Sequence, residues 1–156
     1  MQGQAWAARL ETEMSKSVTI SVVAPEQRDR DFYADLGPFF MDGAVRRELP
    51  YLKDLPTKTW LLAKDAAGQV VGFAGIIPHR NGVTELCSLY VAPAHRSKGL
   101  AEELVARRLS MVDGARVIRV VCPPTSAGLY ADKGMRQVAK RGSYVVLERK
   151  AEKKAA

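Results

Sequence analysis

The residues best suited to chemistry in this sequence form one short segment, Leu89-Tyr-Val-Ala-Pro-Ala-His-Arg96-Ser-Lys-Gly99-Leu-Ala101. A strand-like apolar run leads into a glycine-containing loop, and a helical pattern begins at Gly99. The first turn of a helix has unpaired N–H groups and the positive end of the helix dipole, and the small side chains at Gly99 and Ala101 allow an anion to approach them. Arg96 adds a planar fork of donors and Lys98 a point charge. The segment therefore predicts a binding site for phosphate groups.

Its spacing differs from that of two common phosphate-binding motifs. A P-loop requires Gly-x4-Gly-Lys-Ser/Thr, and the dinucleotide-binding fingerprint requires three glycines. The loop before this helix contains only Gly99. The sequence therefore disfavours nucleotide hydrolysis and NAD binding.

Strand-like and helix-like patterns surround this segment in a regular order. Apolar, β-branched runs predict strands, and apolar residues at helical spacing predict helices. The expected strands are 18–23, 59–64, 69–77, 84–91, 117–122 and 143–147. The expected helices are two short, irregular ones within 26–55, one over 99–113 and one over 126–133.

The connections between these elements predict how the strands pair. Asp65-Ala-Ala-Gly68 and the Asn81-Gly82 dipeptide are typical of hairpin turns, so the three strands from 59 to 91 should form an antiparallel meander. The helix over 99–113 should then make a crossover between the strands 84–91 and 117–122. We expect an α/β (α+β) fold with a mixed, mostly antiparallel sheet and flanking helices.

Three features together resemble the GNAT N-acetyltransferase superfamily. Arg96-x-x-Gly99-x-Ala101 matches the pyrophosphate signature of that family, and Leu-Tyr-Val-x-Pro before it matches the usual lead-in strand. The segment 126–135, Ser-Ala-Gly-Leu-Tyr-Ala-Asp-Lys-Gly-Met, is similar to the family's Ala-x-x-Leu-Tyr-Glu-Lys-x-Gly-Phe. The resemblance covers residues 18–147, and the order of elements agrees with it. Ser126, Pro123 and Met135 depart from the family's usual residues.

The resemblance implies acetyl-CoA, or another acyl-CoA, as the ligand of this site. The parallel strands around 89–91 and 117–122 would splay apart, and the pantetheine arm would pair with the exposed backbone of the first of them. The pyrophosphate would lie on residues 96–102. The residues implied to bind the ligand are Leu89, Tyr90, Val91, Arg96, Ser97, Lys98, Gly99, Leu100, Ala101, Glu102 and Tyr130.

The resemblance also implies the catalytic groups of an N-acyltransferase in which an amine attacks the thioester directly. The departing thiolate needs an acid and the attacking amine must lose a proton. Tyr130 matches the family's tyrosine acid. Glu85, eleven residues before Arg96, matches the carboxylate base of the histone-type branch, and it would act directly or through water.

The acceptor is left open by the sequence. Tyr33, Asp35, Asp42, Glu48 and Tyr51 are candidate acceptor contacts, whereas Phe32, Phe39 and Phe40 fit a core better. The net charge is +7, of which residues 133–156 contribute +6, while residues 26–54 are mildly acidic. We expect a small-molecule acceptor. The alternatives are an amine on a protein or a nucleic acid, which the basic end would attract, and a basic, non-catalytic binding module on the same fold.

Length and composition set the remaining expectations. With 156 residues, 47% of them apolar, the chain should form one domain over 17–149, with an N-terminal extension over 1–16 and a flexible basic tail over 150–156. No segment resembles a signal peptide or a membrane span, so we expect a cytoplasmic protein without a membrane partner. Cys87 and Cys122 should be reduced thiols, and no metal site is expected. A homodimer is left open.

Overall fold

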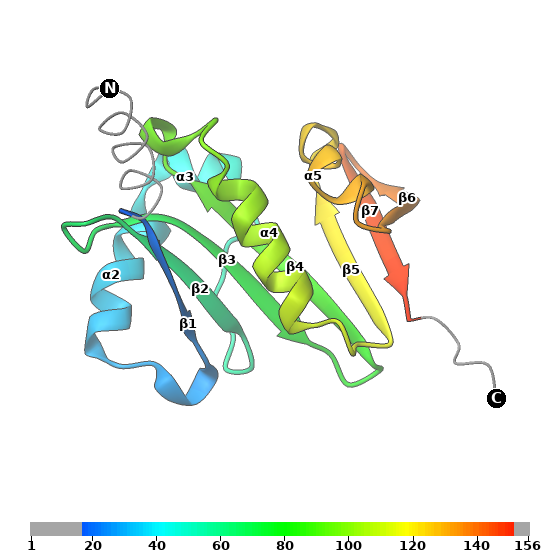
Figure 1. Cartoon of the computed structure of the whole chain (residues 1–156), viewed down its shortest axis with the longest axis horizontal. Helices are drawn as coiled ribbons and strands as arrows, with labels where there is room; N and C mark the ends of the chain where they lie inside the picture. Colours follow the sequence, from blue (N-terminus) through cyan, green and yellow to red (C-terminus); the bar gives the residue numbers. More distant parts are fainter. Residues whose placement is uncertain (1–16, 152–156) are drawn as a thin grey trace, which may run out of the picture.

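Seven strands form one sheet in the order β1-β2-β3-β4-β5-β7-β6 (Figure 1). The structure is a computed structural model, and it describes residues 17–151. Neighbouring strands are antiparallel except for β4 and β5, which are parallel. The expected mixed, mostly antiparallel sheet is confirmed.

The elements follow the chain in nearly the expected order. The strands are β1 (Thr19–Val23), β2 (Thr59–Lys64), β3 (Val70–Pro78), β4 (Val83–Val91), β5 (Val117–Cys122), β6 (Arg136–Arg141) and β7 (Tyr144–Lys150). The helices are α2 (Arg30–Met41), α3 (Gly43–Glu48), α4 (Leu100–Met111) and α5 (Gly128–Ala131), with 3-10 turns at Pro25–Gln27, Pro93–His95 and Pro124–Ser126. None of the helices in this described part is long and apolar enough to cross a membrane.

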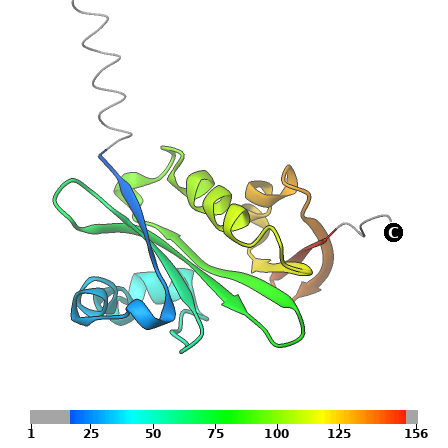
Figure 2. The same ribbon diagram turned by 60° about the horizontal axis from the view of Figure 1, so that its bottom comes forward.

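Helices cover both faces of the sheet. Helices α2 and α3 lie on one face and α4 on the other (Figure 2). Each face therefore has its own apolar cluster. The cluster on the α4 side includes Leu61, Leu86, Leu104, Ile118 and Tyr130. The cluster on the α2 side includes Phe32, Leu36, Trp60, Phe73 and Tyr90.

The β3–β4 hairpin forms as its turn residues predict. Gly82 has φ 82°, in the left-handed region that glycine adopts without a steric penalty. Asn81 Oδ1 accepts a hydrogen bond from Val83 N at 3.1 Å, which closes the turn. This hairpin aligns Gly75 of β3 with Cys87 of β4.

The parallel strands β4 and β5 pair over only half of their length. Their register runs from Val83 with Val117 to Leu86 with Val120, and no pairing follows. The strands then diverge toward the end of the sheet where α3 and α5 lie (Figure 1). Ser88 lies just past the last pair with φ 55°, at an irregular place in the β3–β4 register. The expected splayed parallel strands are therefore present.

Two details differ from the sequence-based expectations. Strand β6 was not expected, because its residues are exposed throughout and carry no alternating apolar pattern; it pairs only with β7, at the edge of the sheet. Lys150, placed in the flexible tail, belongs to β7, and Ala151 N donates to Arg116 O at 2.8 Å. The extension over 1–16 and residues 152–156 of the tail lie outside the described residues.

Candidate active site

A cleft of about 580 Å³ opens where β4 and β5 diverge. One bank is formed by Cys87, Ser88 and Leu89 of β4 and the other by Val121 and Cys122 of β5. The loop between α3 and β2 lies along the first bank, and the segment from Pro123 to Tyr130 along the second. Unpaired strand backbone thus borders a cavity of the size that small ligands occupy.

Tyr130 lies at the base of this cleft with its hydroxyl held by a buried arginine. Arg108 of α4 donates from Nη2 to Tyr130 Oη at 2.7 Å, and from Nη1 to the carbonyl oxygens of Gly75 at 3.3 Å and Cys87 at 3.2 Å. Arg108 is 0% exposed and Tyr130 2% exposed. Because the guanidinium can only donate, the phenolic proton of Tyr130 is left to donate elsewhere.

Two opposing effects act on the Tyr130 hydroxyl. Burial raises the pKa of Tyr130 because the phenolate would be poorly solvated, and the adjacent Arg108 guanidinium partly offsets this. Tyr130 is therefore a neutral phenol at physiological pH. The positive charge of Arg108 would stabilise the phenolate that remains after a proton is given away, which suits a general acid.

The predicted anion-binding junction begins α4. Glu103 N donates to Gly99 O, so the N–H groups of the three preceding residues have no partner within the helix. Gly99 has φ 83°, and a Cβ added there would meet no atom within 4 Å. Ser97 also has a positive φ, 63°. The open space at Gly99 is compatible with the approach of a pyrophosphate, and its binding at this junction stays a prediction.

Arg96 is already engaged with the protein. Its Nε donates to Val91 O at 2.9 Å, and its Nη2 pairs with Glu48 Oε1 at 2.5 Å. The guanidinium also lies 5.8 Å from the centre of the Tyr90 ring. These contacts orient the side chain, but the Glu48 carboxylate would compete with a phosphate for the same donors.

Glu85 borders the cleft from the paired part of β4. Its Oε1 lies 3.0 Å from His79 Nε2, and its side chain is 32% exposed. His79 is thus a partner of the Glu85 carboxylate. The position of Glu85 is compatible with a base that acts through water, and its role stays a prediction.

The structure separates the candidate acceptor residues into two groups. Glu48 and Tyr51 line the cleft, and the Tyr51 ring packs against Tyr144 of β7 at 5.9 Å, so the two banks are in contact. Three others do not line it. Asp35 pairs with Lys64, Asp42 caps α3 through Ala44 N, and the Tyr33 side chain is exposed.

Two charged residues of the site, Arg108 and Lys58, were not predicted from the sequence. Arg108 lies on the buried stripe of α4 with Leu104, Val105 and Leu109, and an arginine on an apolar helical face is a signal that was available. Lys58 is 1% exposed and also lines the cleft. It directly precedes strand β2, where an exposed lysine would look the same in the sequence.

A comparison with protein-family models agrees with this geometry. Residues 29–131 match the model of the acetyltransferase (GNAT) family, which is most of the chain. The chain belongs to the GNAT acetyltransferase family. Both the suspected family and the fold class are thereby confirmed. GNAT acetyltransferases are enzymes that use acetyl-CoA, and the roles of the residues described above stay predictions.

Individual relatives of this GNAT chain are distant or partial. The mycothiol acetyltransferase of Segniliparus rotundus is 44% identical over 69 residues, which are 44% of this chain and 24% of that protein. The chain thus spans about a quarter of the length of this curated relative. An acyl-CoA N-acyltransferase from Pseudomonas aeruginosa has a TM-score of 0.71 at 16% identity, over 85% of this chain and 99% of that one.

A further solved structure contains coenzyme A. N-acetylglutamate synthase from Neisseria gonorrhoeae, complexed with coenzyme A and N-acetyl-glutamate, has a TM-score of 0.62 at 14% identity. The match covers 86% of this chain and 36% of that one. At such identities the two solved structures establish the shared GNAT fold.

Proposed function

We propose that this chain transfers an acyl group, most simply acetyl, from acyl-CoA to an acceptor amine that attacks the thioester directly. The observation that carries the proposal is the buried Tyr130–Arg108 pair at the fork of β4 and β5, on the same side as the open N-terminus of α4. An acid for a leaving thiolate thus lines the cleft, and the donors for a pyrophosphate lie at the start of α4, which follows strand β4 in the chain. We infer that one domain, residues 17–149, carries this activity.

In this reaction each residue has a distinct task. The first-turn N–H groups of α4, with Arg96, Ser97 and Lys98, would hold the pyrophosphate of the donor. The backbone of Leu89 and Val91 would pair with its pantetheine arm. Tyr130 would protonate the leaving thiolate, while Arg108 stabilises the resulting phenolate.

A small-molecule amine is the acceptor that the cleft fits best. Its volume lies in the range of small-ligand pockets, and the contact between Tyr51 and Tyr144 joins its banks. The name of the partial relative makes deacetylated mycothiol one compound to test. We further propose a cytoplasmic location, since Cys87 and Cys122 are both unpaired thiols.

A polymeric acceptor is the second candidate, and one observation favours it. Arg141 lines the cleft at the end of the exposed basic strand β6, where it would meet an anionic partner. A protein or a nucleic acid that carries the acceptor amine would then bind across this edge. Activity that falls steeply with salt would support this candidate.

The test is a titration with acetyl-CoA followed by an acceptor screen. At 100 times its dissociation constant a ligand should add about 2.7 kcal/mol to the free energy of unfolding. We expect a clear rise in Tm, competition by ADP, and an acetylated product detected by mass spectrometry. A protein whose Tm does not respond to millimolar acetyl-CoA would be a non-catalytic binding module instead.

A further inference from the structure

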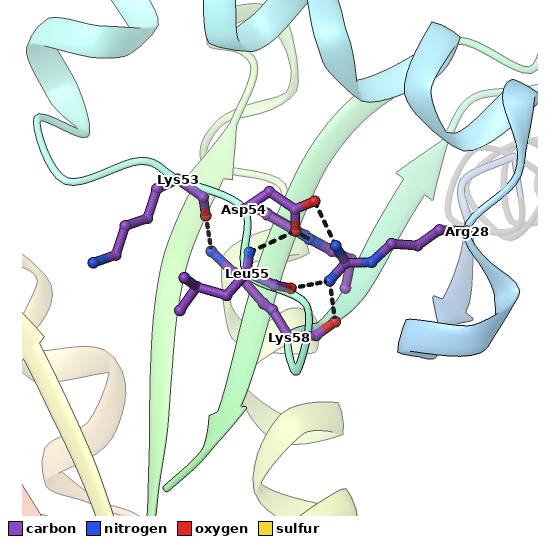
Figure 3. Close-up of polar contacts among 6 residues, drawn as sticks. Arg28, Lys53, Asp54, Leu55 and Lys58 are labelled. Carbon is purple, nitrogen blue, oxygen red and sulfur yellow. Dashed lines mark hydrogen bonds and ion pairs between the residues drawn. The ribbon is translucent and has the colours of Figure 1, made fainter.

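Lys58 has a buried amine, and none of the roles described above involves it. Lys58 is the residue just before β2, and it is only 1% exposed. Its Nζ lies 3.8 Å from the centre of the Trp60 ring and donates to Lys53 O at 2.8 Å (Figure 3). A lysine is almost never buried without a specific partner, so its surroundings are informative.

The third neighbour of this amine is the hydroxyl of Ser88. Lys58 Nζ and Ser88 Oγ are 2.7 Å apart, within hydrogen-bond distance. Ser88 is half-buried, lines the cleft and has a φ of 55° just where β4 leaves β5. An L-residue with such a φ is strained, and the surrounding structure must enforce it. The strained backbone places a hydroxyl between the buried amine and the cleft.

Gly75 makes room for this arrangement. A Cβ at Gly75 would overlap Lys58 Cε and would lie 3.1 Å from Cys87 Sγ and 3.3 Å from Lys58 Nζ. The amine, the thiol of Cys87 and the bare backbone of Gly75 therefore share one space. A side chain at Gly75 would displace the lysine.

One carboxylate near Lys58, that of Asp54, is committed to other partners. Its Oδ2 pairs with Arg28 Nη1 at 2.5 Å, and its Oδ1 accepts from Leu55 N and Trp60 Nε1, each at 2.9 Å. Figure 3 shows the Lys58 amine turned toward the Lys53 carbonyl and away from the Arg28–Asp54 pair. Asp54 thus gives the ammonium form of Lys58 only indirect support.

The other ionisable groups near Lys58 lie on β4. Glu85, shared with His79, and Cys87 both favour the charged amine, as does Asp54. Burial opposes them and is the largest effect, so the pKa of Lys58 is lowered. Burial likewise raises the pKa of Cys87, which keeps the thiol neutral. The neutral form of this amine, which can accept a proton, is therefore more accessible than that of an exposed lysine.

We propose that Ser88 and Lys58 form a relay that accepts the proton of the acceptor's ammonium group. Ser88 Oγ takes the proton from the acceptor nitrogen as it passes its own to Lys58 Nζ. The nitrogen then bonds to the carbonyl carbon, the carbon–sulfur bond breaks, and Tyr130 protonates the departing thiolate. The nitrogen loses its second proton to solvent as the amide forms. Lys58 afterwards loses its proton to solvent, and Tyr130 regains a proton from solvent. The relay rests on the proposed function.

The proposal assigns to this relay the task that the family resemblance suggests for Glu85. Glu85 lies in the paired part of β4 and is bound to His79, whereas Ser88 lies where the strands open. Base and acid would thus approach the reacting atoms from different sides, through Ser88 and through Tyr130. The two assignments differ in which variant loses the rise of the rate with pH.

The kinetic test uses acetyl-CoA with two probe acceptors, benzylamine and hydroxylamine. Benzylamine is an ammonium ion at neutral pH and must lose a proton, whereas hydroxylamine is largely unprotonated. We expect Lys58→Met and Ser88→Ala to lower kcat with benzylamine by about 10²-fold and to change the hydroxylamine rate little. The wild-type rate should rise with pH through the lowered pKa of Lys58, and Lys58→Met should lose that rise.

Controls separate this role from a structural one. Lys64→Met changes the last residue of β2, a lysine that pairs with Asp35 outside the cleft, and it should behave as wild type. Glu85→Gln should keep the rise of the rate with pH but move it to lower pH, because the Glu85 carboxylate favours the charged form of Lys58. Wild-type turnover and an unchanged pH profile in Lys58→Met would overturn the relay while leaving the acyltransferase in place. If acetyl-CoA neither binds wild type nor acetylates either probe, the proposed function itself fails, and the relay with it.

A stability measurement tests the lowered pKa of Lys58 without any turnover. Between that lowered pKa and about 10.4, the unfolded chain binds more protons at this residue than the folded chain. The contribution of Lys58 to stability therefore rises with pH and is lost as pH falls through the folded pKa. We expect the Tm of wild type to rise relative to that of Lys58→Met as the pH rises through this interval. A constant difference would overturn the proposal.

Discussion

The hydrogen bond between Tyr130 and Arg108 joins residues that are 22 positions apart in the sequence. Arg108 has no carboxylate partner among the described residues, and its Nε has no hydrogen-bond partner there either. A buried cation without a counterion is costly. At the residue scale, we therefore propose that Arg108 serves proton donation by Tyr130, where a negative charge would develop on the phenolic oxygen.

Removal of the Tyr130 hydroxyl should affect turnover far more than binding. We expect Tyr130→Phe to lower kcat by about 10²-fold, because the ring still packs but no proton is donated. The acetyl-CoA dissociation constant, measured by calorimetry, should be unchanged. Loss of the hydroxyl also leaves Arg108 Nη2 unpaired, at a cost of about 1–3 kcal/mol, so the assay should run well below the Tm. Wild-type turnover would reduce Tyr130 to a core residue.

Removal of the guanidinium should change the acidity of Tyr130. Arg108 lowers the pKa of Tyr130 against the effect of burial, so Arg108→Met should raise it further. The alkaline fall of kcat, where the acid loses its proton, should then move to higher pH, and the neutral rate should drop by about tenfold or more. A lower rate with an unmoved alkaline limb would indicate that Arg108 only supports the fold.

At the element scale, the start of α4 depends on a glycine in the left-handed conformation. Gly99→Ala should cost about 1 kcal/mol through its positive φ alone, since nothing crowds the added Cβ. It should keep most of the Tm rise caused by acetyl-CoA. Gly99→Glu should abolish that rise, because a carboxylate would face the N–H groups that hold the phosphates.

Gly99→Gln is the matched control for the size of glutamate. It has the same shape without the charge, so it should retain part of the acetyl-CoA response. Equal losses in Gly99→Gln and Gly99→Glu would mean that steric exclusion explains the result. An unaltered response in Gly99→Glu would show that the pyrophosphate binds elsewhere.

At the scale of the whole molecule, the basic charge gathers on one edge of the sheet. Strand β6 is exposed along its length. Lys140 and Arg141 lie at its C-terminal end, where Arg141 lines the cleft. For a small acceptor, the double reversal Lys140→Glu and Arg141→Glu should leave the acceptor KM nearly unchanged. An acceptor KM that rises strongly, and loses its salt dependence, would favour an anionic polymer.

Much of the fold was predictable from local patterns in the sequence. The β3–β4 hairpin follows from Asn81-Gly82, and α4 from its apolar stripe and Gly99. Strand β6 was missed because an edge strand with both faces exposed has no periodic apolar signal; only its partner β7 defines it. Lys150 was assigned to the tail for the same reason, since its strand character comes from pairing with Val117.

The candidate site divides in a similar way. The sequence by itself determined the helix start after Arg96 and Gly99 and the short helix that carries Tyr130, because backbone geometry at a helix start depends on local residues. The binding of phosphate there stays a prediction. Only the tertiary structure decided that Arg108 meets Tyr130, that Glu48 holds Arg96, and that Lys58 is buried beside Ser88. Burial and charge pairing arise between segments far apart in the chain, so no local spacing encodes them.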